Sequence, residues 1–162
     1  MDKAVIENWP DAPPQLSPDL RAEFTANLGN GRVGSRLVSE TDRVRVWHLQ
    51  LAPGERIGFH THVLDYFWTV LTAGRARSHY SNGETNDVQY QPGDTKHHTY
   101  GPDEFMIHDL ENTGDTALIF TTVEFKESAN QPLQLNLTES VAASAAWTAG
   151  DFRHRHHHLR GG

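Results

Sequence analysis

The stretch that decides the fold reads Pro53-Gly54-Glu55-Arg56-Ile57-Gly58-Phe59-His60-Thr61-His62, and an apolar run follows it as far as Gly74. His60 and His62 are two residues apart, so on an extended segment their side chains point to the same face. Two imidazoles on one face can share a metal ion at the usual distance of about 2.0–2.1 Å. The turn residues at both ends and the strand-like sequence between them favour a metal-binding strand over a chance pair of surface histidines.

A carboxylate and a phenol follow this pair directly, at Asp65 and Tyr66. A carboxylate two or three residues beyond a His-x-His pair is a suitable third group for a divalent transition metal. We therefore take Asp65 and Tyr66 as candidate catalytic residues. Asp65 is a candidate metal ligand or a base beside the metal.

Composition and charge narrow the class of protein. The chain of 162 residues has no cysteine, which excludes disulfides, thiolate metal sites and a cysteine nucleophile. Its formal net charge of −7 does not predict binding to nucleic acid. No apolar run approaches the length of a membrane span, and no apolar leader begins the chain. We expect a cytoplasmic protein with no membrane contact.

The pattern along the chain predicts three regions. An N-terminal arm and a short helix occupy 1–31, a β-barrel occupies 32–126, and a C-terminal extension with a His-rich tail occupies 127–162. The helix is expected at 18–28, because Ser17-Pro18 is a helix-start signal and apolar residues then recur every four positions. In the extension we expect an Ala-rich helix at about 139–148, capped by Thr138, or irregular structure.

Between the arm and the extension the apolar pattern changes to the period of two that is typical of strands. We expect strands at 43–51, 65–73, 104–112 and 116–125, the second buried on both faces. Glycine-containing turns at Pro53-Gly54, Asn82-Gly83 and Pro92-Gly93 separate short strands. Short strands at this spacing predict an all-β sandwich or barrel.

The spacing of these residues resembles two motifs of the cupin superfamily. Gly54, His60-Thr61-His62 and Gly74 match the first motif, with Phe67 in place of its usual Glu. His108 and Asn112, with three residues between them, match the end of the second motif. The resemblance covers about residues 40–125.

The resemblance implies a jelly-roll barrel of two antiparallel sheets in which His60, His62 and His108 hold one divalent transition metal. Iron is our first expectation, with manganese, zinc or nickel as alternatives. His97 or His98 could be the third ligand, or contact substrate, instead of His108. Asp65, Tyr66 or no residue at all takes the place of the missing Glu.

Three functions are compatible with this site. The first is a metal-dependent enzyme acting on a small organic molecule, either a dioxygenase of the non-haem Fe(II) type or a metal-assisted lyase or isomerase. The second is a non-catalytic cupin that binds a small molecule or a metal. The third is a metal-free, epimerase-like cupin that uses His and Tyr as acid and base. We also expect a homodimer, because the strand edges of a small jelly roll need covering.

Overall fold

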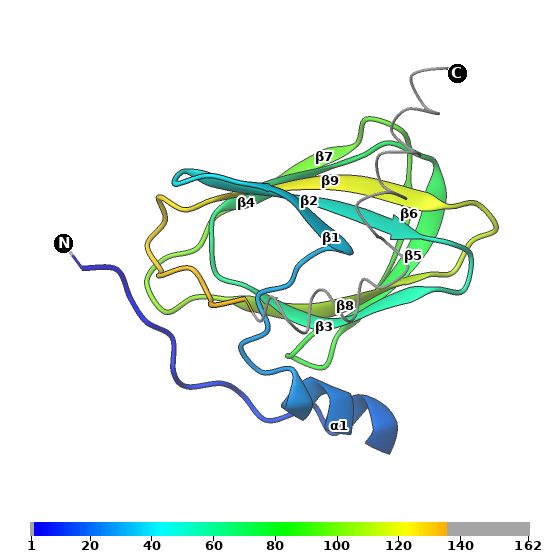
Figure 1. The fold of residues 1–162 in the computed structure, drawn as a ribbon. Coiled ribbons are helices and arrows are strands. Elements are labelled where there is room, and N and C mark those ends of the chain that lie inside the picture. The colour runs from blue at the N-terminus through cyan, green and yellow to red at the C-terminus, as the bar shows by residue number, and fades with distance from the viewer. Residues whose placement is uncertain (1, 136–162) are drawn as a thin grey trace.

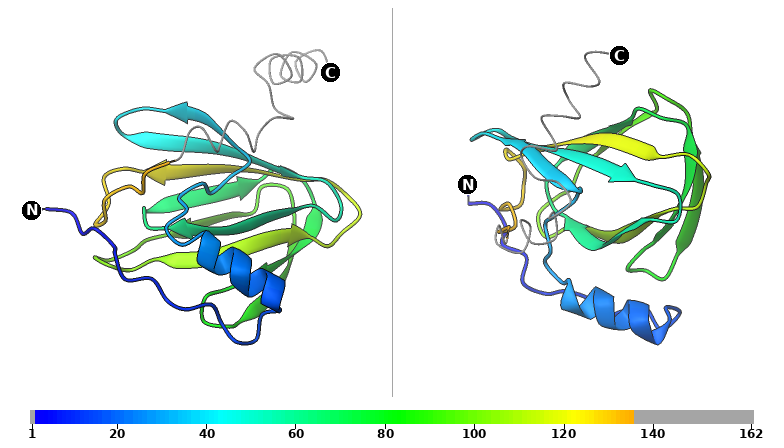
Figure 2. Two further views of the ribbon diagram at one scale, coloured as in Figure 1. Left: turned by 60° about the horizontal axis from the view of Figure 1, so that its bottom comes forward. Right: turned by 45° about the vertical axis from the view of Figure 1, so that its right-hand side comes forward.

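The computed structural model describes residues 2–135 and folds them into one helix and two facing β-sheets (Figure 1, Figure 2). The elements are α1 (Pro18–Ala26), β1 (Arg36–Glu40), β2 (Val44–Leu51), β3 (Arg56–His62), β4 (Tyr66–Val70), β5 (Gly74–His79), β6 (Thr85–Tyr90), β7 (Thr95–His98), β8 (Met106–Asn112) and β9 (Leu118–Phe125). One sheet has the order β1-β2-β9-β4-β7 and the other β3-β8-β5-β6. The predicted all-β jelly-roll barrel with a short helix before it is confirmed.

The expected turns and strands are largely confirmed. Gly54 and Gly93 each follow a proline and have φ of 83° and 92°, a conformation that costs glycine little and other residues more. The strand expected at 65–73 is shorter, as β4. Tyr66 and Val70 are buried, but Phe67 and Thr69 on the outer face are only half-buried. The prediction of burial on both faces was therefore wrong, since nothing among the described residues fully covers the outside of this sheet.

The core fills one end of the space between the sheets. It is formed by inward-facing residues of both sheets, chiefly Leu49, Leu51, Val70, Ala76, Tyr90, Leu110, Leu118 and Phe120. Trp68, Tyr90 and Phe120 meet edge to face, with ring centroids 5.1–5.5 Å apart. Each such pair contributes about 0.5–1.5 kcal/mol beyond its buried area. A cavity remains beside this core, and His60 is among the residues that line it.

Helix α1 covers the outer face of the sheet that contains β3, at the bottom of Figure 1. Ser17 caps its first turn by accepting a hydrogen bond from Leu20 N, and Pro18 stands at the first helical position, as expected. Phe24 is fully buried and meets Phe59 of β3 edge to face at 5.2 Å. The helix ends at Ala26 rather than at 28.

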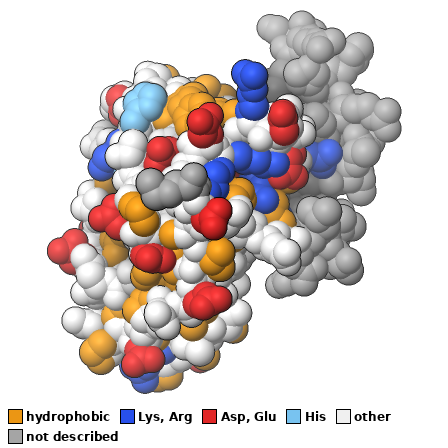
Figure 3. All heavy atoms as spheres, turned by 90° about the vertical axis from the view of Figure 1, so that its left-hand side faces the viewer, with side chains coloured by type: hydrophobic (Ala, Val, Ile, Leu, Met, Phe, Trp, Pro, Cys, Tyr) orange, Lys and Arg blue, Asp and Glu red, His pale blue; other side chains and the backbone are white. Residues whose placement is uncertain are grey.

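The N-terminal arm docks on its own chain, where Ala4 forms a parallel bridge with the buried Asn130. The helix expected at 139–148 and the His-rich tail lie outside the described residues. Within residues 2–135 no helix is long and apolar enough to span a membrane. On the face drawn in Figure 3, acidic side chains are scattered among apolar and neutral ones.

Candidate metal centre

The structure brings His60, His62 and His108 together at the inner face of one sheet. Strands β3 and β8 pair antiparallel with His60 opposite His108, and His62 follows His60 on the same face. One ring nitrogen from each histidine lies within 4.8 Å of the other two. Two strands that are distant in the sequence thus supply one cluster of three nitrogen donors.

The spacing of these nitrogens fits a shared ion. His62 Nε2 and His108 Nε2 are 3.2 Å apart. Two nitrogens that each bind one ion at about 2.1 Å, at an angle of about 90–110°, are separated by about 3.0–3.4 Å. The trio also includes two buried nitrogens, Nδ1 of His62 and of His108, with no hydrogen-bond partner among the described residues. Unpaired buried polar atoms are uncommon in cores and concentrate at functional sites.

A β-bulge sets the orientation of His60. The pairing of β3 with β8 shifts between Ile57 and His60, so Gly58 and Phe59 both lie opposite the single residue Asp109. The bulge lets Ile57 and His60 share the inner face although three positions separate them. His60 Nδ1 donates a hydrogen bond of 2.8 Å to Gly58 O. With the proton fixed on Nδ1, His60 Nε2 is left as an acceptor for a metal.

The three imidazoles are neutral. Burial lowers the pKa of His60 to about 4. Burial, together with the neighbouring imidazoles, holds the pKa values of His62 and His108 well below their usual range. Neutral imidazole is the form that binds metal, so no proton has to leave before an ion enters at pH 7.

Tyr66 occupies the inner-face position on β4 nearest the trio, whereas Phe67 points outward toward His97 and Phe125. The Tyr66 ring is stacked between His62, with centroids 4.1 Å apart, and His98, at 4.7 Å. Of the options for the missing Glu, Tyr66 is thus the residue that the structure brings to the site. Burial raises the pKa of Tyr66 well above its usual value, so its hydroxyl keeps its proton at pH 7.

Asp65 is not brought to the trio. Its Oδ1 accepts a hydrogen bond from Tyr100 N at 3.0 Å, and its backbone N donates to Ser128 Oγ at 2.9 Å. It does not line the cavity, whereas Tyr66 beside it does. The structure thus does not place this candidate ligand or base beside the trio, because strand alternation in β4 begins only at Tyr66.

His97 and His98 separate in the same way, because neighbours on a strand face opposite sides. His98 lines the cavity and is half-buried, and burial lowers its pKa. His97 is exposed on the outer face, where its ring contacts Phe67 at 5.2 Å. Neither belongs to the cluster of close nitrogens, which contains His108.

The trio opens onto a cavity of about 400 Å³ between the sheets. This is within the usual size of small-molecule sites. Its wall is formed by Val33, Leu49, His60, His62, Tyr66, Trp68, Ala76, Ser78, Tyr80, Asn86, Val88, Tyr90, Asp94, Thr95, Lys96, His98, Met106, His108, Leu110, Phe120 and Thr122. Most of these were not predicted as site residues, since alternation alone does not say which face of a strand is inner.

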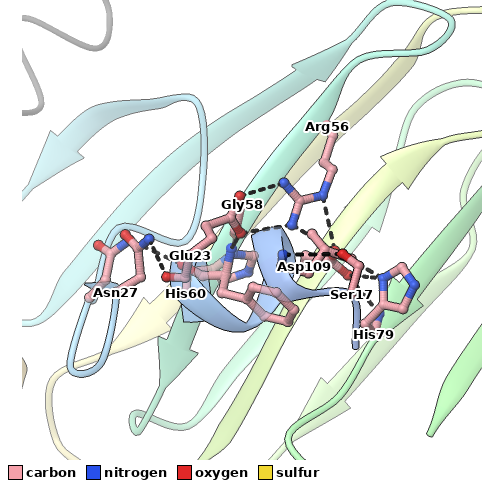
Figure 4. A network of polar contacts seen from close by, with 11 residues as sticks. Ser17, Glu23, Asn27, Arg56, Gly58, His60, His79 and Asp109 are labelled. Carbon is pink, nitrogen blue, oxygen red and sulfur yellow. Dashed lines mark hydrogen bonds and ion pairs between the residues drawn. The ribbon is translucent and has the colours of Figure 1, made fainter. Parts of the chain in front are cut away.

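A charged network that the sequence did not predict lies on the opposite face of β3 and β8 (Figure 4). Arg56 donates to both oxygens of Glu23, at 2.6 and 2.7 Å, and to Asp109 Oδ2 at 2.9 and 3.0 Å. His79 completes it, with its backbone N 2.6 Å from Asp109 Oδ1. Glu23 Oε2 also accepts a hydrogen bond from Phe59 N in the bulge, so α1 is tied to the strand that carries His60.

Other residues of the two motif-like segments have structural roles. Asn112 is buried, and its side chain bonds Leu51 O, Thr116 O and Gly114 N. A Cβ at Gly74 would lie 2.6 Å from a Leu118 side-chain carbon. Asn112 thus stabilises the turn between β8 and β9, and Gly74 lets β5 approach Leu118 of β9 closely. The three histidines form the candidate site.

Comparison with known proteins places the fold. No protein-family model matches the sequence, and no curated protein matches it significantly. A cupin-domain protein from Bordetella pertussis Tohama I is 26% identical, with a TM-score of 0.50, over 60% of this chain and 95% of that chain. A protein with a double-stranded β-helix domain from Klebsiella pneumoniae is 28% identical, with a TM-score of 0.45, over 58% of this chain and 72% of that chain.

A third solved structure, described as a predicted oxalate decarboxylase from Thermotoga maritima, is 26% identical, with a TM-score of 0.35, over 51% of this chain and 79% of that chain. The two facing antiparallel sheets, with a histidine trio on two adjacent strands, define a small barrel protein with a site able to hold a metal. The chain therefore has the cupin fold.

Proposed function

We propose that the protein is a metal-dependent enzyme that acts on a small organic molecule, with His60, His62 and His108 as the metal ligands. The supporting observation is a cluster of three imidazoles, each with a ring nitrogen within 4.8 Å of those of the other two, in the wall of a cavity of about 400 Å³. A divalent transition metal bound there would supply a Lewis acid and a template and, as Fe(II), the means to engage dioxygen.

The ligand set favours dioxygenase chemistry. Three protein donors leave about three positions of a six-coordinate ion, room for a chelating substrate and dioxygen. A lyase or isomerase reaction at the same ion needs a base that faces the substrate. Of the two residues proposed as catalytic, Tyr66 faces the cavity and Asp65 does not.

The side chains around the trio bind and orient the substrate in this proposal. Tyr66, held between two imidazole rings, keeps a protonated hydroxyl beside the ligands. The aromatic wall at Trp68, Tyr90 and Phe120 excludes water from the far end of the cavity. A drier site strengthens electrostatic interactions with the reacting group.

Metal content and oxygen uptake test the proposal. The sequence ends with histidines at 154, 156, 157 and 158, which would bind metal on their own. The test therefore uses the full chain with these four replaced by Ser, called here the tail-Ser protein, purified without a nickel column. We expect about one transition-metal ion per chain, with iron the most abundant. Oxygen uptake by the Fe(II)-loaded protein with small organic acids supports a dioxygenase, and product without uptake supports the lyase or isomerase.

A metal-free acid–base enzyme is the second candidate. The observation that favours it is the stack of Tyr66 between His62 and His98, which sets a phenol beside two imidazoles. This candidate predicts full turnover after chelation of all metal. Ligand binding without turnover, with or without metal, would instead identify a non-catalytic binding protein.

We further propose a homodimer. Each sheet has edge strands, β1 and β7 in one and β3 and β6 in the other. Unpaired edges of this kind are commonly covered by a partner. Sedimentation at high micromolar concentration should give twice the chain mass of 18.2 kDa, and a clean monomer would refute the dimer.

A further inference from the structure

The cavity opens along the neighbouring edges of the two sheets. The wall residues most open to solvent are Asn86 on β6, Asp94 just before β7, and Thr95 and Lys96 on β7. Strand β6 is the edge of one sheet, and β7 is the edge of the other. Most of the other wall residues, among them His60 and Phe120, are buried. A ligand therefore enters between β6 and β7 and reaches the histidines from there.

This mouth carries one cation. Lys96 is the only lysine or arginine among the described residues that line the cavity. It faces inward on the same strand as His98, and its charge contributes to the lowered pKa of His98. No carboxylate among residues 2–135 forms an ion pair with it. Asp94, the only acidic residue in the wall, turns Oδ2 to Gln91 N at 2.8 Å.

Behind Lys96 the wall is apolar. Trp68 lies opposite Lys96 in the pairing of β4 with β7, and Trp68 packs edge to face on Tyr90 and Phe120. Two buried residues with hydroxyl groups, Ser78 and Thr122, also line the wall. A ligand that fits this wall has one negative end, an apolar body and an oxygen that can accept a hydrogen bond.

The charge of the proposed metal site points the same way. A ligating histidine carries no negative charge, so a divalent ion held by His60, His62 and His108 would keep its full double positive charge. A buried charge without a partner is costly, and an anionic ligand lowers that cost. Lys96 at the mouth and an ion at the inner wall would both attract the same kind of molecule.

We propose that the cavity binds a small organic carboxylate, whose acid group is held by Lys96 at the β6–β7 mouth and whose apolar body packs on Trp68, Tyr90 and Phe120. The proposal rests on the proposed function for what happens at the histidines. The role of Lys96 is separate from it, because Lys96 lies on β7, outside the histidine cluster. Lys96 is thus a specificity-determining residue for a charged substrate.

Calorimetric titration with two matched probes tests this. The probes are 3-phenylpropionate and its neutral amide, which differ in the charge of one end. They are titrated at low salt into the tail-Ser protein without metal and into the same protein loaded with Zn²⁺. The variants are Lys96→Met, Lys96→Arg and, as a control for net charge, Arg43→Met in the exposed turn between β1 and β2.

The metal-free protein should bind the acid about tenfold more tightly than the amide, and high salt should reduce this preference. Lys96→Met should reduce the preference at least about fivefold, whereas Lys96→Arg and Arg43→Met should keep it. Equal binding of acid and amide, no binding of the acid at millimolar concentration, or an undiminished preference in Lys96→Met would each overturn the proposal. Zn²⁺ uptake is read separately, so a protein that binds zinc without the preference refutes only the carboxylate. A protein with the preference but no zinc refutes only the metal site.

Discussion

The ionisable side chains on the two faces of the strand pair β3 and β8 lie in opposite environments. On the inner face His60, His62 and His108 are neutral, and His62 and His108 each have a buried nitrogen without a partner among the described residues. On the outer face Arg56 is bound on one side by Glu23 and on the other by Asp109. The same two strands thus carry a network of paired charges on the outer face. On the inner face they carry a cluster of metal-binding nitrogens, some of them without a partner among the described residues. Saturated polar groups stabilise a fold, whereas unsaturated ones are available to a ligand.

The bulge at Gly58 and Phe59 joins the two faces. Phe59 N donates outward to Glu23 Oε2 at 3.0 Å, and Gly58 O accepts inward from His60 Nδ1 at 2.8 Å. A Cβ at Gly58 would lie 3.1 Å from that same Glu23 oxygen, so a glycine lets the helix approach this closely. The position of α1 is therefore coupled to the orientation of one proposed ligand.

The largest effect is expected on the inner face. Replacing His60, His62 or His108 singly with Ala should lower the metal affinity of the tail-Ser protein by well over about 100-fold, beyond what residues supporting a ligand usually cost. Asp65→Asn should leave the metal affinity unchanged, because that carboxylate accepts a hydrogen bond from Tyr100 N instead of facing the metal site. Competition with a chromophoric chelator measures both. Full affinity in His108→Ala, together with loss in His98→Ala, would identify His98 as the third ligand.

The outer network should affect stability instead. Asp109 is fully buried and bonds Arg56 and His79, so Asp109→Ala leaves both without their partner. We expect the free energy of unfolding, measured with urea, to fall by about 2–3 kcal/mol. The loss is smaller than for a fully buried pair because Arg56 is partly exposed. The control is Asp87→Ala, which breaks the exposed pair with Arg77 and should leave the urea midpoint unchanged. Equal midpoints for the two variants would mean that the network contributes no stability.

Glu124 tests whether other groups facing inward are also kept neutral. Burial raises its pKa to about 7, and Trp47 Nε1 donates to its Oε1 at 2.7 Å. Between pH 4.5 and 7 the folded chain keeps a proton that the unfolded chain has lost. Stability should therefore fall as pH rises through this window and level off above it.

Glu124→Gln replaces the titrating carboxyl group by a neutral amide, whose oxygen can still accept the hydrogen bond from Trp47. Between pH 4.5 and 8 the variant should gain about 2 kcal/mol of unfolding free energy relative to the unaltered protein. Urea unfolding at these two pH values measures the gain. Parallel pH dependence in the two proteins would show that Glu124 is ionised in the fold.

The smallest effect concerns the coupling through the bulge. Glu23→Ala removes the acceptor of Phe59 N and should lower metal affinity about tenfold, the lower end for residues that orient a ligand. Asp19→Ala, which removes a carboxylate from the first turn of the same helix, should leave it unchanged. The same chelator competition is the measurement. If Glu23→Ala binds metal normally, the bulge keeps its shape without the helix.

The barrel and the shared face of His60 and His62 could be predicted from the sequence because both depend on local spacing, whereas the choice of His108 came from the resemblance of its spacing to Asn112. Alternation marks strands, and His60 and His62 share a face whatever the strand pairs with. The sequence did not predict that Tyr66 rather than Asp65 faces inward, since that depends on where β4 begins. The choice between His97 and His98 depends likewise on which face of β7 meets the cavity.

The outer network and the mouth were beyond the sequence for a different reason. Glu23 and Arg56 meet only because α1 folds back on β3, and the bulge that carries Gly58 exists only in the pairing with β8. Lys96 appears in the sequence as one more charged residue, and its place opposite Trp68 follows from the register of β4 and β7. A single sequence does not show which distant elements contact one another.

Anomalous diffraction from crystals of the tail-Ser protein loaded with Zn²⁺ or Fe(II), recorded on both sides of the metal's absorption edge, tests the central claim most directly. The structure predicts one anomalous peak at about 2.1 Å from a ring nitrogen of each of His60, His62 and His108. Crystals without a peak between these three rings, or with a peak at Asp65 or His97 in its place, would contradict the assignment of the metal centre.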